Sequence, residues 1–263
     1  MADESTKIWD ELMEDAVSRP LEGDGYLYLI ADSHLGDSRA PEADFVAMLA
    51  RLEKPVGVVL LGDLFKVWLA PPRFLNPKTA LVLDSLQQCR AGGVWVALVV
   101  GNREFFVPTA PEKVAGWGLP FDVVADGALL VAWGGRRYGF THGDLANRQD
   151  VRYLRWRRLA RGSLLARLFG MLPGFAVRWI SRRGEQALGA TNREIKISYP
   201  RQEVEKFAQR VAKGLDGFFI GHFHKEGEVY PPEGGVLRMV PDWFSTRKVG
   251  RLAPDGTYKV LIP

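Results

Sequence analysis

The chain has 263 residues, of which 47% are hydrophobic and 25% charged, which is typical of a folded globular protein and excludes a disordered one. Its single cysteine, Cys89, excludes an internal disulfide and any thiolate metal cluster. The acidic first 20 residues lack the pattern of a secretory signal, and no run of 18 apolar residues occurs, so we expect a cytoplasmic protein that does not span a membrane.

The net charge of +4 is distributed unevenly along the chain. Between Leu145 and Arg183, ten arginines are accompanied by one acid, Asp150, so this segment carries +9 and the rest of the chain −5. A strongly basic element on a mildly acidic body indicates contact with an anionic partner.

Strands and helices are predicted to alternate in the first hundred residues. Apolar runs rich in β-branched residues predict strands over 26–31, 56–61 and 94–100. Apolar residues at three- and four-residue spacing predict helices between them, over 42–53 and 77–90. Continuous apolar strands separated by helices indicate a sheet that is covered on both faces.

The second half of the chain begins with a predicted hairpin over 128–144 that turns at Gly134–Gly135. A long basic insertion with helical patterns follows over 145–200. A last helix is predicted over 201–213, and it leads into a strand that starts at Gly217.

Each well-defined predicted strand ends in groups that can bind a metal ion, at the place where open α/β sheets bind ligands. These ends read Asp32-Ser33-His34, Gly62-Asp63, Gly101-Asn102-Arg103-Glu104, His142-Gly143-Asp144 and Gly221-His222-Phe223-His224. A single histidine more often has another role, but all four histidines of the chain fall at these ends. Imidazole, carboxylate and amide donors without sulfur favour Mn²⁺, Fe or Zn²⁺.

This order of blocks resembles the calcineurin-like metallophosphoesterase superfamily, with D-x-H, G-D, G-N-x-E/D, H-G-D and G-H-x-H all present between residues 32 and 224. The resemblance implies an α/β fold, a four-layer α/β/β/α sandwich with an inserted helical lid. We therefore expect an N-terminal extension over 1–23 and one metallophosphoesterase domain over 24–263, in which 145–200 is the basic lid.

The resemblance also implies two divalent metal ions, Mn²⁺ first, with Fe, Zn²⁺ or Mg²⁺ as alternatives. One ion would be held by Asp32, His34, Asp63 and His224. The other would be held by Asp63, Asn102, His142 and His222, so that Asp63 bridges the two. Such a pair, about 3.5–4 Å apart, activates water and binds the oxygens of an in-line displacement.

Arg103 stands where many members of the superfamily have a histidine that can protonate a leaving alkoxide. Arginine stays protonated at any physiological pH, so it can neutralise phosphoryl oxygens but cannot act as a general acid. A phosphate monoester leaves as an anion without a proton, so Arg103 favours a pyrophosphate substrate over an alkyl ester. The other interpretation is that Arg103 only anchors a surface loop.

Within the superfamily, the sequence looks like the UDP-2,3-diacylglucosamine diphosphatase family of lipid A biosynthesis. The matching stretches are ADSHL, GDLFKVW, GNREF, His142 with Asp150 eight residues later, Tyr153, Arg157 and the late PDW at 241–243. The departures are Lys66 in place of an acid, Glu104 in place of aspartate, Phe223 in place of threonine, and the N-terminal extension.

This resemblance implies hydrolysis of UDP-2,3-diacylglucosamine at its α-phosphorus, giving UMP and 2,3-diacylglucosamine 1-phosphate. Asp63, Asn102 and Arg103 would be the catalytic residues. The substrate would be contacted by Asn102, Arg103, Asp150, Tyr153, Arg157, Asn192, Lys196 and His222.

The basic insertion favours a lipid substrate independently, because the apolar stretch 164–180 is interrupted by Arg167, Pro173 and Arg178 and is too polar to span a bilayer. We expect it to contact anionic lipid at the cytoplasmic face of the inner membrane. A helical hairpin packed on the sheet, with a solvated arginine face, is the alternative. Aliphatic residues outnumber aromatic ones there, so we expect no nucleic acid, and no obligate protein partner is evident.

Two other functions stay open on the sequence alone. One is a metal-dependent phosphodiesterase or phosphatase acting on soluble nucleotides or phosphoproteins. The other is a metal-free scaffold of the same fold, which the complete ligand set disfavours.

Overall fold

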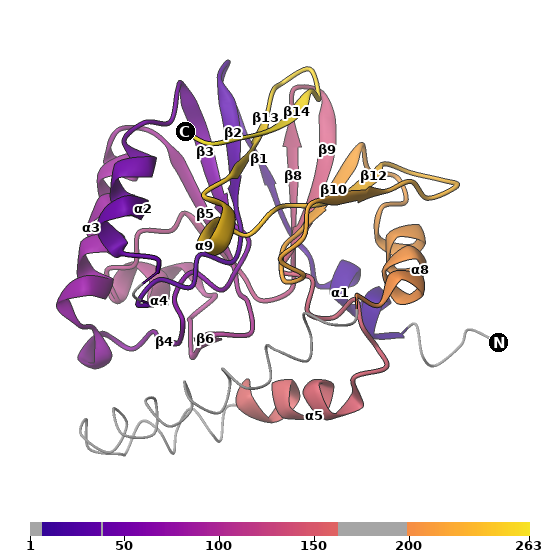
Figure 1. Cartoon of the computed structure of the whole chain (residues 1–263), viewed down its shortest axis with the longest axis horizontal. Coiled ribbons are helices and arrows are strands. Elements are labelled where there is room, and N and C mark those ends of the chain that lie inside the picture. Colours follow the sequence, from indigo (N-terminus) through magenta and orange to yellow (C-terminus); the bar gives the residue numbers. More distant parts are fainter. Residues whose placement is uncertain (1–6, 38, 163–198) are drawn as a thin grey trace.

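The computed structural model describes residues 7–37, 39–162 and 199–263 and arranges them as two six-stranded sheets packed between helices (Figure 1). The helices are α1 (Lys7–Glu14), α2 (Glu42–Leu49), α3 (Pro77–Ala91), α4 (Pro111–Gly116), α5 (Val151–Ala160), α8 (Arg201–Val211) and α9 (Trp243–Thr246), with a 3₁₀ turn at Pro72–Phe74. None of the helices in these described ranges is both long and apolar enough to cross a membrane.

One sheet, sheet B, combines four parallel strands from the first half of the chain with the two C-terminal strands. Its strands, in spatial order, are β14 (Tyr258–Leu261), β13 (Val249–Leu252), β2 (Tyr26–Ile30), β3 (Pro55–Leu60), β5 (Trp95–Val99) and β7 (Val123–Ala125). The four strands β2, β3, β5 and β7 are parallel to one another, so their carboxyl ends lie at one edge of the sheet.

The other sheet, sheet A, is mixed. Its strands, in spatial order, are β1 (Val17–Pro20), β8 (Ala128–Trp133), β9 (Arg136–Thr141), β10 (Gly217–Ile220), β12 (Val236–Met239) and β11 (Gly227–Val229). Strands β9 and β10 are parallel neighbours, so His142 and His222, which follow them, leave the sheet side by side. A short pair, β4 (Trp68–Leu69) and β6 (Glu104–Phe105), lies apart from both sheets.

Alternation along the strands divides the apolar residues among three cores. In β2, Leu27 and Leu29 face sheet A, whereas Tyr28 and Ile30 face α2 and α3. A third core lies on the far face of sheet A, beneath α1 and α8. Helix, sheet, sheet and helix therefore follow one another, which confirms the predicted four-layer α/β/β/α fold.

The predicted elements of the first half agree with the structure to within a few residues at most of their ends. The helix predicted over 42–53 ends earlier, at Leu49, because Ala50 and Arg51 form the turn into β3. The hairpin turns at Gly134–Gly135 as predicted, since both glycines adopt positive φ angles. Of the expected lid, α5 is described, and residues 163–198 lie outside the described residues.

The expected N-terminal extension contributes two elements to the sandwich. Strand β1 adds to sheet A as the parallel neighbour of β8, and α1 packs against α8. Trp9 is the anchor, because its ring meets Phe207 edge-on at 5.5 Å and its Nε1 donates to the Leu145 carbonyl at 2.9 Å. The extension therefore covers both the third core and the segment that follows His142.

Replacing this anchor should destabilise the whole sandwich. We expect Trp9→Ala to lower the free energy of unfolding by about 3–5 kcal/mol, because a fully buried indole leaves a cavity. Chemical denaturation measures this change. Lys7→Ala on the exposed side of the same helix is the control and should cost about 0.5 kcal/mol or less. Equal effects of the two substitutions would contradict the anchoring role.

Candidate dinuclear metal centre

The chain segments that leave the strands of both sheets meet at one end of the sandwich. Sheet B supplies the segments after β2, β3 and β5, and sheet A supplies those after β9 and β10. Hydrogen bonds join the sheets there: among them, the His222 amide donates to Asp32 Oδ2, and His142 Nδ1 donates to the Leu61 carbonyl, both at 2.7 Å. The structure thus brings all seven predicted ligand residues together.

The backbone at this end is unusual for residues with side chains. A positive φ angle costs a non-glycine residue of the order of 1–3 kcal/mol and tends to occur at functional sites. Five of the predicted ligands adopt one: Asp32, His34, Asp63, His222 and His224. The segments after β3 and β5 approach each other so closely that two positions require glycine. A Cβ on Gly62 would lie 2.7 Å from the Gly101 backbone, and a Cβ on Gly101 would lie 2.6 Å from the Asp63 amide nitrogen.

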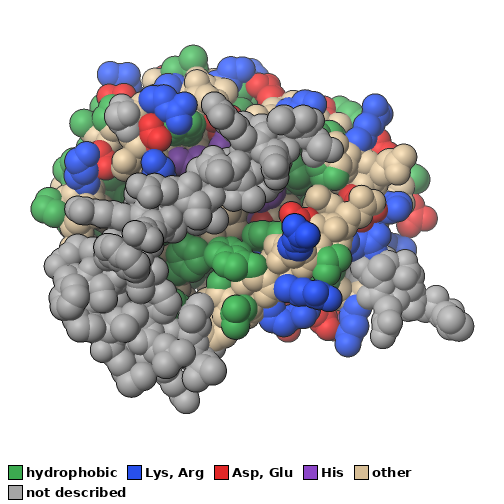
Figure 2. Space-filling model, turned by 60° about the horizontal axis from the view of Figure 1, so that its bottom comes forward, with side chains coloured by type: hydrophobic (Ala, Val, Ile, Leu, Met, Phe, Trp, Pro, Cys, Tyr) green, Lys and Arg blue, Asp and Glu red, His purple; other side chains and the backbone are tan. Residues whose placement is uncertain are grey.

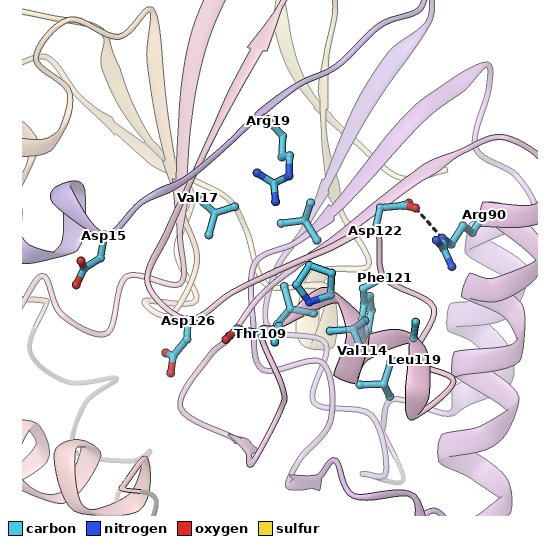
Figure 3. Close-up of a pocket in the computed structure, with 15 residues that line it drawn as sticks. Asp15, Val17, Arg19, Arg90, Thr109, Val114, Leu119, Phe121, Asp122 and Asp126 are labelled. Carbon is cyan, nitrogen blue, oxygen red and sulfur yellow. Dashed lines mark hydrogen bonds and ion pairs between the residues drawn. The ribbon is translucent and has the colours of Figure 1, made fainter.

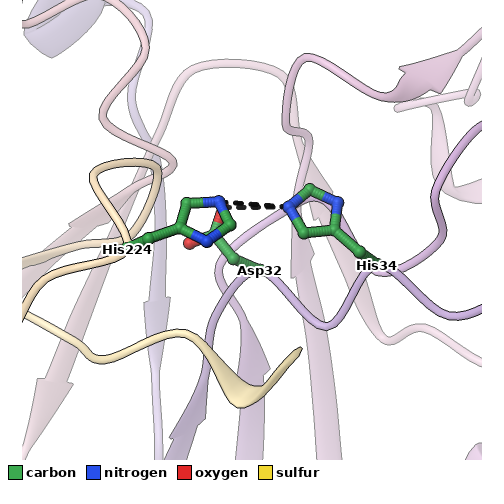
Figure 4. A group of neighbouring side chains, drawn as sticks. All are labelled: Asp32, His34 and His224. Carbon is green, nitrogen blue, oxygen red and sulfur yellow. Dashed lines mark hydrogen bonds and ion pairs between the residues drawn. The ribbon is translucent and has the colours of Figure 1, made fainter. Parts of the chain in front are cut away.

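The first group consists of Asp32, His34 and His224, whose donor atoms converge (Figure 4). The two Nε2 atoms of the histidines are 3.2 Å apart, and Asp32 Oδ1 is 3.6 Å from that of His224. Asp32 Oδ1 is buried and has no hydrogen-bond partner among the described residues. A buried carboxylate oxygen that faces two imidazole nitrogens fits a divalent cation, which would satisfy all three donors.

The second group consists of Asp63, Asn102, His142 and His222. The amide oxygen of Asn102 is 2.9 Å from His142 Nε2 and 3.2 Å from His222 Nδ1. Because His142 Nδ1 donates to a carbonyl, Nε2 is the ring nitrogen that faces the group, and a metal ion bound there would take the place of its proton.

Asp63 lies between the two groups. Its Oδ2 is 3.9 Å from His34 Nε2, and its Oδ1 is 3.6 Å from His142 Nε2. Oδ1 also accepts the Arg103 amide at 2.8 Å, which sets the orientation of the carboxylate. One side chain therefore presents an oxygen to each group, the arrangement that a bridging ligand needs.

Burial dominates the electrostatics of the site. It lowers the pKa of His34 well below its usual value and that of His222 to about 3, so both imidazoles are neutral, the form that binds metal. Burial raises the pKa of Asp32 to about 6. For His142, burial acts in the opposite direction, but the surrounding carboxylates Asp63, Asp32 and Asp144 raise its pKa to about 9.

Two carboxylates that sequence reasoning gave no role support the ligands. Buried Glu104 accepts the amides of Gly101, Asp63 and Leu64 at 2.7–2.9 Å and so holds two ligand loops together. Asp242 caps α9 and places Oδ2 3.6 Å from His224 Nδ1, which directs Nε2 into the first group. In the sequence, Glu104 is the acid of the G-N-x-E/D block and Asp242 is the aspartate of the PDW stretch, so both motifs marked these positions.

Arg103 is buried, and its Nε lies 3.7 Å from Asp63 Oδ2. The interpretation of Arg103 as a surface-loop anchor is therefore wrong. Its guanidinium lies beside the second group, where it can neutralise charge on a bound anion.

The predicted substrate residues on α5 form contacts within the protein. The Asp150 carboxylate caps α5 by accepting the Tyr153 amide at 2.9 Å. The Tyr153 hydroxyl donates to Asp144, and its ring lies 6.5 Å from that of His222. Arg157 Nε donates to Asp144 at 2.7 Å. Tyr153 thus borders the second group, whereas Asn192 and Lys196 lie outside the described residues.

A separate cavity of about 530 Å³ opens between β1 and β7, the edge strands of the two sheets (Figure 3). Its lining includes apolar side chains such as Val114 and Phe121, together with Asp122, which pairs with Arg90. The residues that line it include none of the predicted ligands.

Comparison with known proteins gives sequence relatives along most of the chain. No family model matches. The chain is 26% identical over 246 residues to a UDP-2,3-diacylglucosamine hydrolase of Neisseria gonorrhoeae, which covers 90% of this chain and 97% of that protein. A protein of the same name from Xanthomonas campestris pv. campestris is 28% identical over 242 residues, covering 86% and 95%. The resemblance expected from the motifs is therefore confirmed.

Solved structures with a similar chain path are more distant. A dimetal phosphatase from Danio rerio is 14% identical with a TM-score of 0.43, covering 88% of this chain and 94% of that one. Vacuolar Protein Sorting 29 from Cryptosporidium parvum is 14% identical with a TM-score of 0.40, covering 92% and 98%.

The position of Asp63 predicts a specific defect when its charge is removed. Protein purified without chelator and loaded with Mn²⁺ should hold two ions per chain by elemental analysis, and Asp63→Asn should hold one or none, because both groups lose their shared carboxylate. Asp84→Asn, which removes an exposed acid from α3, is the matched control and should keep both ions. Full occupancy in Asp63→Asn would contradict the bridging arrangement.

Proposed function

We propose that this protein is a metal-dependent hydrolase that cleaves the pyrophosphate bond of UDP-2,3-diacylglucosamine, releasing UMP and 2,3-diacylglucosamine 1-phosphate. The observation that carries the proposal is the position of Asp63, with one carboxylate oxygen facing each of two donor groups. The substrate comes from the curated relatives, which carry the name UDP-2,3-diacylglucosamine hydrolase.

The proposed metal sites follow the two donor groups. Asp32, His34 and His224 would hold one ion, Asn102, His142 and His222 the other, and Asp63 both. Their nitrogen and oxygen donors suit Mn²⁺ first, with Fe, Zn²⁺ and Mg²⁺ as the other candidates. When bound, a pair of divalent ions supplies an activated water and neutralises charge at phosphorus.

The position of Arg103 supports a pyrophosphate, and not an alkyl ester, as the substrate. Arg103 is held beside Asp63 by its backbone amide, so its guanidinium is fixed where the phosphoryl oxygens would lie. It cannot supply a proton, which favours a leaving group that departs as an anion, such as a sugar phosphate. Asn102 and the second group's histidines would orient the α-phosphate, and Tyr153 would border the substrate.

We also propose that α5 contacts the cytoplasmic face of the inner membrane. Its arginines point two ways. Arg157 and Arg161 are mostly buried and paired within the protein, whereas Arg152, Arg155 and Arg158 are exposed. Two large apolar residues lie exposed among these outer arginines, Val151 (49%) and Leu159 (67%), and Trp156 (37%) lies at the border between this outer face and the inner one.

Basic and apolar residues on one exposed helix face favour an interface with anionic lipid. Figure 2 looks onto this end of the molecule, where histidine side chains are visible and lysine and arginine side chains lie around them. A lipid substrate would then enter the candidate metal centre from the same membrane surface that α5 contacts.

The proposed reaction is tested by comparing substrates and tracing oxygen. Purified protein with Mn²⁺ should hydrolyse UDP-2,3-diacylglucosamine in mixed micelles with a kcat/KM at least about 100-fold above that for UDP-glucose or p-nitrophenyl phosphate. In ¹⁸O-water, the label should appear in UMP alone, because attack is at the α-phosphorus.

Other outcomes would select the alternatives. Equal turnover of all three substrates would overturn the lipid assignment and favour a general phosphodiesterase or phosphatase. A protein that binds no transition metal and cleaves none of them would favour a metal-free scaffold. Label in the sugar-lipid phosphate would place the attack at the other phosphorus.

The membrane contact is tested by charge removal on the outer face of α5. Replacing Arg152, Arg155 and Arg158 by Ser should weaken binding to vesicles containing phosphatidylglycerol about 100-fold, since each arginine near an anionic surface contributes about 1 kcal/mol. Vesicle sedimentation measures the loss. Arg19, Arg51 and Arg201, exposed elsewhere and replaced by Ser together, are the matched control. If both triple variants bind equally, α5 is not the contact surface.

A further inference from the structure

The inward face of α5 spans the loops of the second metal group. It is formed by Tyr153, Trp156 and Arg157, a spacing that places side chains on one side of a helix, and Arg161, the C-cap residue, continues it. The Trp156 ring meets Phe105 edge-on at 5.8 Å, next to the loop that carries Asn102. This face therefore contacts both the segment after His142, through Asp144, and the segment after β5.

Arg161, directly after α5, makes the closest approach to the loop that carries Asn102 and Arg103. Its Nη2 donates to the Gly101 carbonyl at 3.1 Å and approaches the Val100 carbonyl at 3.4 Å. Its Nη1 pairs with Asp126, which directly follows β7. Only 17% of the side chain is exposed. Burial lowers its pKa to about 10, so it remains charged at neutral pH.

The same loop is held from its other side by Glu104, which accepts the Gly101 amide at 2.7 Å. Gly101 thus has its amide bound from inside the fold and its carbonyl bound by α5. Asp126 receives Arg157 as well, at 3.6 Å, so one carboxylate at the end of β7 holds two successive turns of the α5 segment. None of these atoms belongs to a predicted metal ligand's side chain.

We propose that Arg161 is a positioning residue that, through Asp126 and the Gly101 carbonyl, sets the spacing between α5 and the loop bearing Asn102 and Arg103. This inference rests on the proposed function, because spacing matters for a substrate long enough to touch both α5 and the metal centre. A small ester that occupies the metal centre alone should not depend on it. Arg161 therefore determines which substrates are used, whereas the metal ligands determine whether hydrolysis occurs.

The test is Arg161→Gln, with Arg90→Gln as the matched control. Arg90 pairs with Asp122 at the beginning of β7, as Arg161 pairs with Asp126 at its end. For UDP-2,3-diacylglucosamine in micelles, Arg161→Gln should lower kcat about 10- to 100-fold, the effect of misplacing a substrate by about an ångström. Its Mn²⁺ content and its rate on p-nitrophenyl phosphate should not change, and Arg90→Gln should behave as the unsubstituted protein.

Two further variants separate positioning from simple loss of stability. Arg161→Lys keeps the charge and one donor, so it should recover part of the rate on the lipid substrate. Asp126→Asn removes the carboxylate that orients Arg161 and should reproduce the selective loss. Hydrogen exchange should be faster in peptides covering 100–106 and 151–161 in Arg161→Gln, and not in Arg90→Gln.

Parallel losses on both substrates together with loss of Mn²⁺ would overturn the inference, as would unchanged activity on both. If the unsubstituted protein does not cleave the lipid substrate at all, the proposed function fails. Hydrogen exchange then decides the inference by itself: faster exchange in both peptides of Arg161→Gln supports the link between α5 and the loop, and unchanged exchange overturns it.

Discussion

The hydrogen bond from the His222 amide to Asp32 Oδ2 joins the two sheets at the end where the candidate site lies, and the rest of the site depends on that junction. Sheet B alone presents carboxylates, an amide and one imidazole, and sheet A alone presents three imidazoles. Neither set could hold two cations by itself. Because facing sheets are about 10 Å apart, loops of two or three residues are enough to close the distance. The positive φ angles of the ligand residues turn these short loops back toward one another.

Such a site is unfavourable for the fold by itself. Several carboxylates and imidazoles are buried at one place, and burial raises the pKa of Asp32 to about 6 and that of Glu104 to about 7. The three apolar cores of the sandwich offset this cost, and a bound cation would remove most of it. Glu104 and Asp242 fix the ligands through backbone amides and the His224 ring, so the donors are arranged before any ion arrives.

Helix α5 and its C-cap residue, Arg161, show that arginines close together in the sequence can have separate roles. Arg157 and Arg161 hold the helix to Asp126, Asp144 and the Gly101 carbonyl, whereas the outer arginines face solvent beside exposed apolar side chains. Counting arginines in the sequence treats them all as a single basic element. A loss of lipid turnover after arginine substitution can therefore have two physical origins, and the face on which the arginine lies decides which one applies.

The sequence by itself determined the sandwich and the residues at the strand ends. Apolar alternation and the five ordered blocks are patterns within short stretches of sequence, and strands and the turns after them are specified by such short stretches. It could not determine that Asp63 would place one oxygen toward His34 and the other toward His142, that Asp150 and Arg157 would be engaged within the protein, or that Arg161 would reach the Gly101 carbonyl. The contacts of Asp63, Arg157 and Arg161 follow from the packing of sheet on sheet and helix on loop, which brings together residues 13 to 79 positions apart in the sequence, and only the tertiary structure decides such contacts.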